Sequence, residues 1–389
     1  MSTLYKYIKK YCNDSVEERP ICAEDTTVLT ALSYLNFEKV MNFNEEKTLS
    51  ELLPHLDDLV KGAQLSPFVQ RTYELVLNSS RFNSISVQKP YSVADTKVDC
   101  RIAAVTFKFS PTLAVVVFRG TDLSLLAWKE DIILGYHKII PGHAESVNYL
   151  THVIKSNPGV NVYVCGHSKG ANLATYAACK IDRELAQQII EVYDLDGPGF
   201  RFEFFNTEEY TRMQDKFTRL IPYDDIVGQC LIHNPNFRVV KTYRFFKPVQ
   251  HAQFVWKFRK GKLMYVDDIS SFTKRFNYYF RKLIDQTPIN EIQIMAEEGF
   301  KIFEESGIYY IGDFFKPSRR KLKGLLDGYK NLAEESRQII IHLVYQLAKV
   351  YLLAEFDILW FYKNTVNFRH KRLYKKKEPK VAKAKQIKQ

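Results

Sequence analysis

Apolar and polar residues alternate along the first two thirds of the chain in a way that predicts strands and helices in turn. Runs rich in β-branched and aromatic residues are typical of strands, and they occupy 100–109, 112–118, a stretch around Val162, 189–194, 217–221 and 237–246. Segments with apolar residues at helical spacing, such as 143–155, separate several of them. This alternation predicts an α/β fold, with a mostly parallel sheet covered by helices.

Two hairpins are expected within this pattern. Only a two-residue break that contains a proline separates the strands 100–109 and 112–118, so these two should pair directly. The segment 254–266 is the second candidate, with Gly261 at its turn.

Residues 25–80 are expected to be helical and to pack across the sheet. Asp25 or Thr26 can cap a first helix, a second begins near Ser50, and a third follows the Ser66-Pro67 pair.

The chain changes character near Thr287, where helices with charged faces begin. We therefore expect an α/β domain over 1–285, a helical C-terminal extension over 286–363 and a tail over 364–389. The apolar stretch 338–363 is interrupted by polar residues, namely His342, Lys349, Glu355 and Asp357. These favour a helix that faces the core or a partner over a membrane span, with a helix lying on a membrane surface as the alternative.

The net charge of +12 is concentrated in the tail. Residues 364–389 hold ten Lys or Arg and one Glu, a net of +9, which leaves +3 for the rest of the chain. The tail has few large apolar residues and is expected to be disordered. It serves either as a solubilising segment or as a binder of anionic membrane or nucleic acid, of which membrane is the preferred partner.

The N-terminal residues and the cysteine spacing both bear on the cellular compartment. The first residues are charged and lack the apolar run of an export signal, so we expect a cytoplasmic protein that the tail can bring to the periphery of a membrane. The six cysteines contain no Cys-x-x-Cys pair, which predicts neither a zinc site nor a disulfide framework.

The stretch 161–180, NVYVCGHSKGANLATYAACK, carries the clearest chemical signal. An apolar strand, a Gly-His-Ser-Lys-Gly turn and a helix rich in alanine follow one another, as in the nucleophile turn of a serine hydrolase. Gly166 and Gly170 stand two residues on either side of Ser168, where a Cβ would collide with neighbouring backbone. The helix that begins after Ser168 aims free amides, first that of Lys169, at a developing oxyanion.

Further residues can complete such a site. The strand 112–118 ends in a Phe-Arg-Gly-Thr-Asp loop, so Gly120 and Thr121 are candidates for the second oxyanion amide. Among the histidines downstream of Ser168, His251 follows the strand 237–246 at its carboxyl end and is the candidate base.

The orienting acid is less sharply defined by the pattern. Asp224 and Asp225 lie just past the strand 217–221, and either can bond the imidazole. Asp194 and Asp196 compete from one strand earlier, but we expect them to have a structural role around the Gly-Pro-Gly that follows.

Eight segments, taken in order, resemble the Mbeg1-like group of α/β-hydrolases, relatives of the class 3 lipases: LTALSYLNF, AAVTF, FRGTD, WKEDI, GHSKGANLA, DLDGPGF, IPYDDIVG and HAQFVW. The resemblance spans about residues 20–260. It implies Ser168 as nucleophile, Asp225 as acid and His251 as base, with oxyanion donors near Thr121 and Lys169. Where the related lipases carry Leu or a similar residue after the nucleophile, this chain has Lys169.

Together these features predict a serine acyl-hydrolase of esterase or lipase type that needs neither metal nor organic cofactor. The expected substrate is a small-molecule or lipid carboxylic ester, and thioesters or peptides suit the same triad. The alternative is a hydrolase-like scaffold that acts mainly through its C-terminal helices and basic tail, by binding a membrane or a partner.

Overall fold

A nine-stranded sheet forms the centre of the computed structural model, which describes residues 4–63, 66–234, 236–243, 247–310, 313 and 318–356. Its strand order is β1-β2-β3-β4-β5-β6-β7-β8-β11. The run from β4 to β8 is parallel, and the remaining pairs are antiparallel. The predicted α/β class, with a mostly parallel sheet covered by helices, is confirmed.

Strands of the sheet follow the sequence pattern closely in the centre and less closely at the edges. The bounds are β1 Glu46–Thr48, β2 Ser86–Asp95, β3 Cys100–Ser110, β4 Leu113–Phe118, β5 Asn161–His167, β6 Ile189–Leu195, β7 Phe217–Pro222, β8 Arg238–Val240 and β11 Tyr265–Val266. The hairpin of β3 and β4 is confirmed. The pattern missed β1 and β2, and β8 is shorter than the predicted 237–246, of which 244–246 lie outside the described residues.

The second predicted hairpin is also present. β9 Phe258–Arg259 and β10 Lys262–Leu263 pair antiparallel as a separate two-stranded ribbon. Gly261 at the turn has a φ of +75°, a conformation that glycine adopts without strain.

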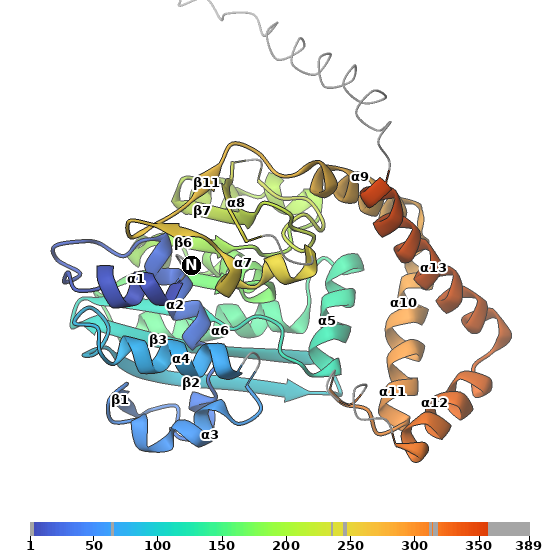
Figure 1. Cartoon of the computed structure of the whole chain (residues 1–389), viewed down its shortest axis with the longest axis horizontal. Helices are drawn as coiled ribbons and strands as arrows, with labels where there is room; N and C mark the ends of the chain where they lie inside the picture. Colours follow the sequence, from blue (N-terminus) through green and yellow to red (C-terminus); the bar gives the residue numbers. More distant parts are fainter. Residues whose placement is uncertain are drawn as a thin grey trace, which may run out of the picture.

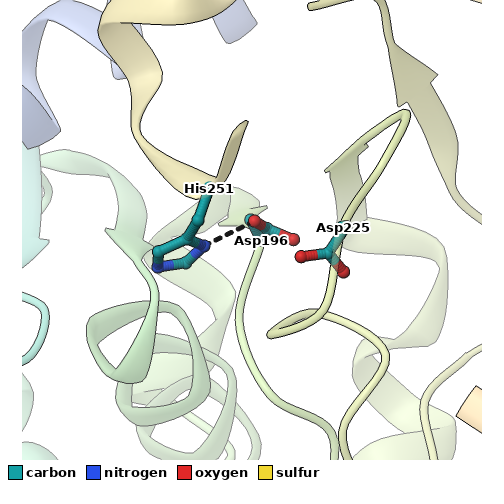
Figure 2. A group of neighbouring side chains, drawn as sticks. All are labelled: Asp196, Asp225 and His251. Carbon is teal, nitrogen blue, oxygen red and sulfur yellow. Dashed lines mark hydrogen bonds and ion pairs between the residues drawn. The ribbon is translucent and has the colours of Figure 1, made fainter. Parts of the chain in front are cut away.

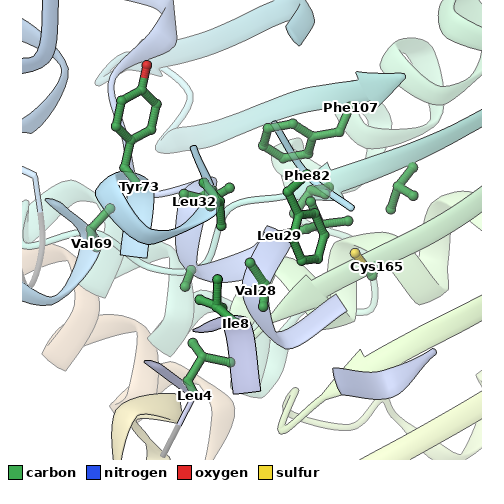
Figure 3. Close-up of a cluster of buried hydrophobic side chains, with 14 of the residues drawn as sticks. Leu4, Ile8, Val28, Leu29, Leu32, Val69, Tyr73, Phe82, Phe107 and Cys165 are labelled. Carbon is green, nitrogen blue, oxygen red and sulfur yellow. The ribbon is translucent and has the colours of Figure 1, made fainter. Parts of the chain in front are cut away.

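Alternation along the central strands gives the sheet two apolar faces, each covered by helices (Figure 1). Val115 and Val117 of β4 face α1 Leu4–Tyr11, α2 Ala23–Leu32 and α4 Ser66–Val76, whereas Val116 faces the other side. Figure 3 shows the first of these clusters, in which side chains of the N-terminal helices meet those of the sheet: Leu4, Ile8, Val28, Leu29, Leu32, Val69, Tyr73, Phe82, Phe107 and Cys165.

The N-terminal helices match the prediction in number but not in every bound. α2 begins at Ala23, with Cys22 as cap and Asp25 accepting a hydrogen bond from the Cys22 amide, so neither Asp25 nor Thr26 is the cap. Near Ser50 the chain forms only a 3-10 turn and the short α3 Leu56–Val60. α4 starts at the predicted Ser66.

On the opposite face lie α5 Leu125–Tyr136, α6 Pro141–Ser156, α7 Lys169–Lys180 and α8 Glu208–Met213. The C-terminal helices then cover one flank: α9 Ser271–Gln286, α10 Ile289–Ile294, a π-helical turn Met295–Gly299, α11 Phe300–Glu305, α12 Arg319–Asn331 and α13 Glu334–Phe356. The helical part begins at Ser271, earlier than the predicted change near Thr287. The expected disordered tail, 364–389, lies outside the described residues.

Close backbone contact between β4, β5 and α7 depends on two glycines. A Cβ on Gly166 would lie 2.1 Å from the Gly170 carbonyl oxygen, and one on Gly170 would lie 2.1 Å from the carbonyl oxygen of Phe118. Both neighbours are backbone atoms, which cannot swing aside. Glycine at these two positions therefore sets how near α7 packs to the end of β4.

Gly170→Ala is expected to lower the free energy of unfolding by about 1–3 kcal/mol or more, because α7 must move away from β4. Gly135→Ala in the last turn of α5 is the control: its Cβ meets open space, and alanine in a helix should be neutral or stabilising by at most about 0.5–1 kcal/mol. Urea unfolding followed by circular dichroism measures both. Equal stability of Gly170→Ala and the parent chain would contradict the packing constraint.

Candidate active site

Ser168 lies at the sharp turn between β5 and α7, as the motif predicts. Its φ of 58° and ψ of −135° are sparsely populated for a residue with a side chain, and such strain is typical of a residue that the surrounding fold holds for function. The first turn of α7 begins immediately after it, so the free amides at the helix start lie next to the serine. The strand, turn and helix that the motif predicts around Ser168 are therefore present.

The loop after β4 lies against this turn. A Cβ on Gly120 would approach the Ser168 Cβ to 3.1 Å and the His167 carbonyl oxygen to 2.5 Å, so only glycine allows the loop this close. Thr121 follows, and its hydroxyl donates to Asp131 Oδ2 at 2.6 Å. Burial raises the pKa of Asp131 to about 6. The structure thus brings the predicted Gly120 and Thr121 beside Ser168, and Asp131 of α5 was not foreseen.

Arginine contacts hold the same loop in place. The guanidinium of Arg119 donates to the carbonyl oxygens of Ser33 and Leu35 and pairs with Glu38 at 3.0 Å. These are the residues that follow α2, so the loop is tied to the N-terminal layer. A loop fixed in this way can present its amides without reorganising.

His251 ends a short 3-10 helix, Lys247–His251, and its Nδ1 lies 2.6 Å from Oδ2 of Asp196 (Figure 2). Asp196 is fully buried, and His251 is partly buried. Burial lowers the pKa of His251, which favours the neutral imidazole. A carboxylate accepts only, so Nδ1 carries the proton and Nε2 is left as the basic nitrogen.

Asp196, rather than Asp225 or Asp224, is therefore the carboxylate that contacts His251. Oδ1 of Asp225 accepts from the Val227 amide at 2.8 Å, and Oδ2 of Asp224 accepts from the Gln250 side chain at 3.0 Å. Asp196 directly follows β6, the neighbour of β5, whereas Asp225 lies three residues past the end of β7, one strand farther from Ser168. The structural role expected for Asp196 does not describe its contacts.

Asp225 nonetheless belongs to the same cluster. Ligand atoms of Asp196, Asp225 and His251 all lie within 4.8 Å of one another, and Figure 2 shows the two carboxyl groups facing each other. Burial and the charge of Asp196 raise the pKa of Asp225 well above its ordinary value, and burial raises that of Asp196 too. Two buried carboxylates in contact cannot both be ionised at low cost, so the pair holds one proton.

The proton belongs on Asp225. Asp196 already accepts from His251, which favours its ionised form, while Asp225 Oδ2 and Asp196 Oδ1 have no other partner in the described chain. A hydroxyl on Asp225 can donate to Asp196 and satisfy both oxygens. Asp225 then supports Asp196 from behind.

A buried ion pair fixes the loops that carry both carboxylates. Arg219 of β7 pairs with Asp194 at 2.5 Å and also donates to the carbonyl oxygens of Gly197 and Gly228. Asp194 accepts from the Gly197 amide at 2.9 Å, which matches the structural role predicted for it. One guanidinium therefore spans the loop after β6 and the loop after β7.

His167 is a site residue that the motif contained but that was not singled out. Its ring stacks on that of His251 with centroids 4.5 Å apart, and its Nε2 donates to the His251 carbonyl oxygen at 2.9 Å. Burial keeps the pKa of His167 well below its ordinary value, so the ring is neutral and Nδ1 accepts from the Tyr34 hydroxyl at 3.1 Å. This chain of contacts fixes the position of the His251 backbone.

Lys169 has a structural side chain although it follows the serine. Its ammonium group lies 2.7 Å from Glu130 Oε2 and donates to the Arg101 carbonyl oxygen at 2.9 Å. Both charged side chains are almost completely buried. The positive charge is therefore neutralised inside the protein between α7 and α5, and it gives no reason against an apolar substrate.

A cavity of about 440 Å³ adjoins Ser168 and His251. Its walls are mainly apolar, and they come from both ends of the chain: from α2 and α4, from Trp128 and Ile132 of α5, and from the C-terminal helices through Leu283, Met295, Leu343 and Leu347. A cavity with such walls accommodates an acyl chain or another apolar group.

The cluster of Asp196, Asp225 and His251 is also the one group of potential metal ligands found among the described residues. Protein nitrogen and oxygen ligands lie about 2.0–2.2 Å from zinc, and two of them cannot approach each other to 2.6 Å around one ion. The His251 to Asp196 contact is thus a hydrogen bond, and a metal would have to widen it.

Lys169→Met is expected to lower the free energy of unfolding by about 3–5 kcal/mol, because it leaves the Glu130 carboxylate buried without its cation. Adding Glu130→Gln should recover part of the loss, which a double-mutant cycle measures as coupling. Lys180→Met is the control at the exposed end of the same helix, where the pair with Glu209 is worth at most about 1 kcal/mol. Additive effects of Lys169→Met and Glu130→Gln would contradict the pairing.

Comparison with known proteins identifies the family. A sequence search of curated proteins finds no match. Solved structures similar in fold include a fungal lipase (16% identity, covering 63% of this chain and 85% of that chain, TM-score 0.38), an MDLA mutant from Penicillium cyclopium (15%, 62% and 83%, 0.38) and the native lipase propeptide complex of Rhizomucor miehei (16%, 56% and 66%, 0.35). The Mbeg1-like family model matches residues 76–301, more than half of the chain, and the protein therefore belongs to the Mbeg1-like family.

Proposed function

We propose that this protein is a serine hydrolase that cleaves carboxylic esters, with Ser168 as nucleophile and His251 as base. The observation that carries the proposal is the His251 to Asp196 hydrogen bond, beside a strained serine on the wall of the same apolar cavity. A carboxylate, an imidazole and a serine hydroxyl with these roles form a catalytic triad on several unrelated folds. The triad proposed here is Ser168, His251 and Asp196.

The reaction proceeds through an acyl-enzyme. Ser168 Oγ attacks the ester carbonyl carbon while its proton moves to His251 Nε2, and the imidazolium is stabilised by Asp196. The tetrahedral oxyanion accepts hydrogen bonds from the backbone amides of Lys169 and of Thr121 or Gly120. Collapse expels the alcohol, which takes the proton from His251. Water then attacks the acyl group by the same route and releases the acid.

Asp131 and Asp225 act as positioning residues in this proposal. Asp131 holds the Thr121 hydroxyl and so orients the loop that carries the oxyanion amide. Asp225, protonated, donates to Asp196 and keeps that carboxylate turned toward His251. The mainly apolar cavity favours an ester with an apolar acyl chain or alcohol, whereas a peptide would bring unpaired amides into it.

The decisive experiment compares the parent chain with Ser168→Ala in labelling by a fluorophosphonate probe and in hydrolysis of p-nitrophenyl butyrate. Labelling should disappear, and kcat/KM should fall by about 10⁴-fold or more. Ser124→Ala, which changes a serine that caps α5, is the control and should keep its labelling. Equal labelling of parent and Ser168→Ala would refute the proposal and leave a hydrolase-like scaffold.

The two carboxylates should differ sharply on substitution. Asp196→Asn is expected to reduce kcat/KM by about 10⁴-fold, because the amide cannot hold the required His251 tautomer. Asp225→Asn should stay within about tenfold of the parent, since an amide NH₂ replaces the hydroxyl donor.

Asp224→Asn is the matched control, because this neighbour contacts Gln250 rather than the pair. Its kcat/KM should equal that of the parent. If Asp225→Asn lost as much activity as Asp196→Asn, the acid of the triad would be Asp225 after all, as the family resemblance implies.

A further inference from the structure

α13 combines two apolar faces that have different neighbours. Its buried residues, Ser336, Leu343, Val350 and Ala354, recur at seven- and four-residue intervals and form one stripe along the helix. This stripe faces the protein: Arg275 of α9 donates to the Ala354 carbonyl oxygen at 2.6 Å, and Leu343 lies on the wall of the cavity that adjoins Ser168. One side of α13 is therefore part of the substrate cavity.

The opposite side of α13 is also apolar, and it faces outward. Ile341, Tyr345, Leu352 and Phe356 lie half a turn from the buried stripe and are 54%, 61%, 56% and 70% exposed. We call these four residues the outer face. With 23 residues, α13 is long and apolar enough to cross a membrane by length and composition.

α12 adds a second exposed stripe on the same flank of the molecule, the side farthest from α1 (Figure 1). Leu322, Leu326 and Tyr329 are 50%, 60% and 37% exposed and stand four and three residues apart. The glycines on the other side, Gly324 and Gly328, pack against α11 and its C-cap, since a Cβ on them would lie within 3.0 Å of Ser306 or Ile302. The apolar stripe of α12 therefore points away from the protein.

The charged residues around these apolar stripes indicate which kind of surface could bind them. Exposed cations border the α12 stripe, namely Arg319, Arg320, Lys323 and Lys330, with Asp327 as the single acid of the helix. The sequence that follows α13 adds ten Lys or Arg and one Glu over 364–389. Apolar stripes flanked by cations match a bilayer with anionic headgroups, which takes up the apolar side chains and attracts the charges.

The contacts of α13 within the protein argue against its crossing the bilayer. The inner stripe of α13 packs on α9 and the cavity, and Lys349 and Glu355 lie on its sides. A helix in a bilayer core would have to leave those contacts and carry both ionisable residues into hydrocarbon. A helix that lies along the surface keeps them.

We propose that α12 and the outer face of α13 form a docking surface for an anionic lipid bilayer, and that this surface presents the Ser168 cavity to the bilayer. The surface lies beyond residues 76–301, the region that the family model matches. Docking stands on the exposed stripes and charges alone, whereas the delivery of a bilayer-embedded ester to Ser168 rests on the proposed function.

Vesicle flotation of the full chain tests docking. Vesicles of phosphatidylcholine with 30% phosphatidylglycerol should carry the protein upward, and pure phosphatidylcholine or 0.5 M NaCl should reduce the bound fraction several-fold. The triple variant Ile341→Ser, Tyr345→Ser, Leu352→Ser should bind at least tenfold more weakly. The control is Val98→Ser, Ile139→Ser, Ile190→Ser, which changes three exposed apolar residues elsewhere and should bind like the parent.

Hydrolysis separates docking from chemistry. Both triple variants should hydrolyse soluble p-nitrophenyl butyrate at the parent rate, which also shows that they fold, but only the outer-face triple should lose turnover of a long-chain ester embedded in the vesicles. Ser168→Ala should float like the parent and hydrolyse neither ester. If the parent itself lacked esterase activity, the proposed function would fail while flotation still decided docking.

Three results would overturn the docking proposal. The first is flotation of the outer-face triple equal to that of the parent. The second is resistance of vesicle-bound protein to alkaline carbonate extraction, which would make α13 a membrane span. The third is a change from dimer to monomer in the triple variant, measured by light scattering, with unchanged flotation, which would assign the outer face to a second copy of this chain.

Discussion

The approach of α7 to the end of β4 is the constraint on which the site depends. Gly166 and Gly170 let backbone meet backbone at distances that any Cβ would prevent, and Ser168 between them takes up the strained turn that results. The same approach places the loop of Gly120 against the serine, since its own missing Cβ allows contact with Ser168 and His167. The position of Ser168 and the position of the loop after β4 are therefore set by the same backbone packing.

Three buried or partly buried ion pairs hold the loops around the Ser168 turn and so keep its strained backbone conformation in place. Lys169 with Glu130 ties α7 to α5, Arg219 with Asp194 ties the loops after β6 and β7, and Arg119 ties the loop after β4 to the end of α2. Each cation also donates to backbone carbonyl oxygens, so its desolvation is offset by several hydrogen bonds. Removing one member of such an ion pair would leave its partner charge buried and would free the loop that it holds. The main role of these ion pairs is therefore to position the loops rather than to add stability.

The sequence determines the centre of the fold and the serine turn more clearly than the acid. Period-two runs and a Gly-x-Ser-x-Gly turn are local signals, and they located β3 to β7 and Ser168 correctly. The choice between Asp196 and Asp225 depends on how two loops fold back over adjacent strands, which no local pattern encodes. β1 and β2 were missed because strands with mixed polar residues lack a clear alternation. Glu130 and Asp131 were missed because a charged pair in a helix is typical of a solvated face.

The C-terminal helices close one side of the apolar cavity beside Ser168. In a chain that ended after β11, the walls supplied by Leu283, Met295, Leu343 and Leu347 would be missing, and the cavity beside Ser168 would be open on that flank. α13 covers this side of the cavity, and it is apolar both on the stripe that faces the cavity and on its outer face. If the proposed function holds, an apolar ester leaves water at the outer face before it reaches His251, because both faces of this wall favour apolar groups over water.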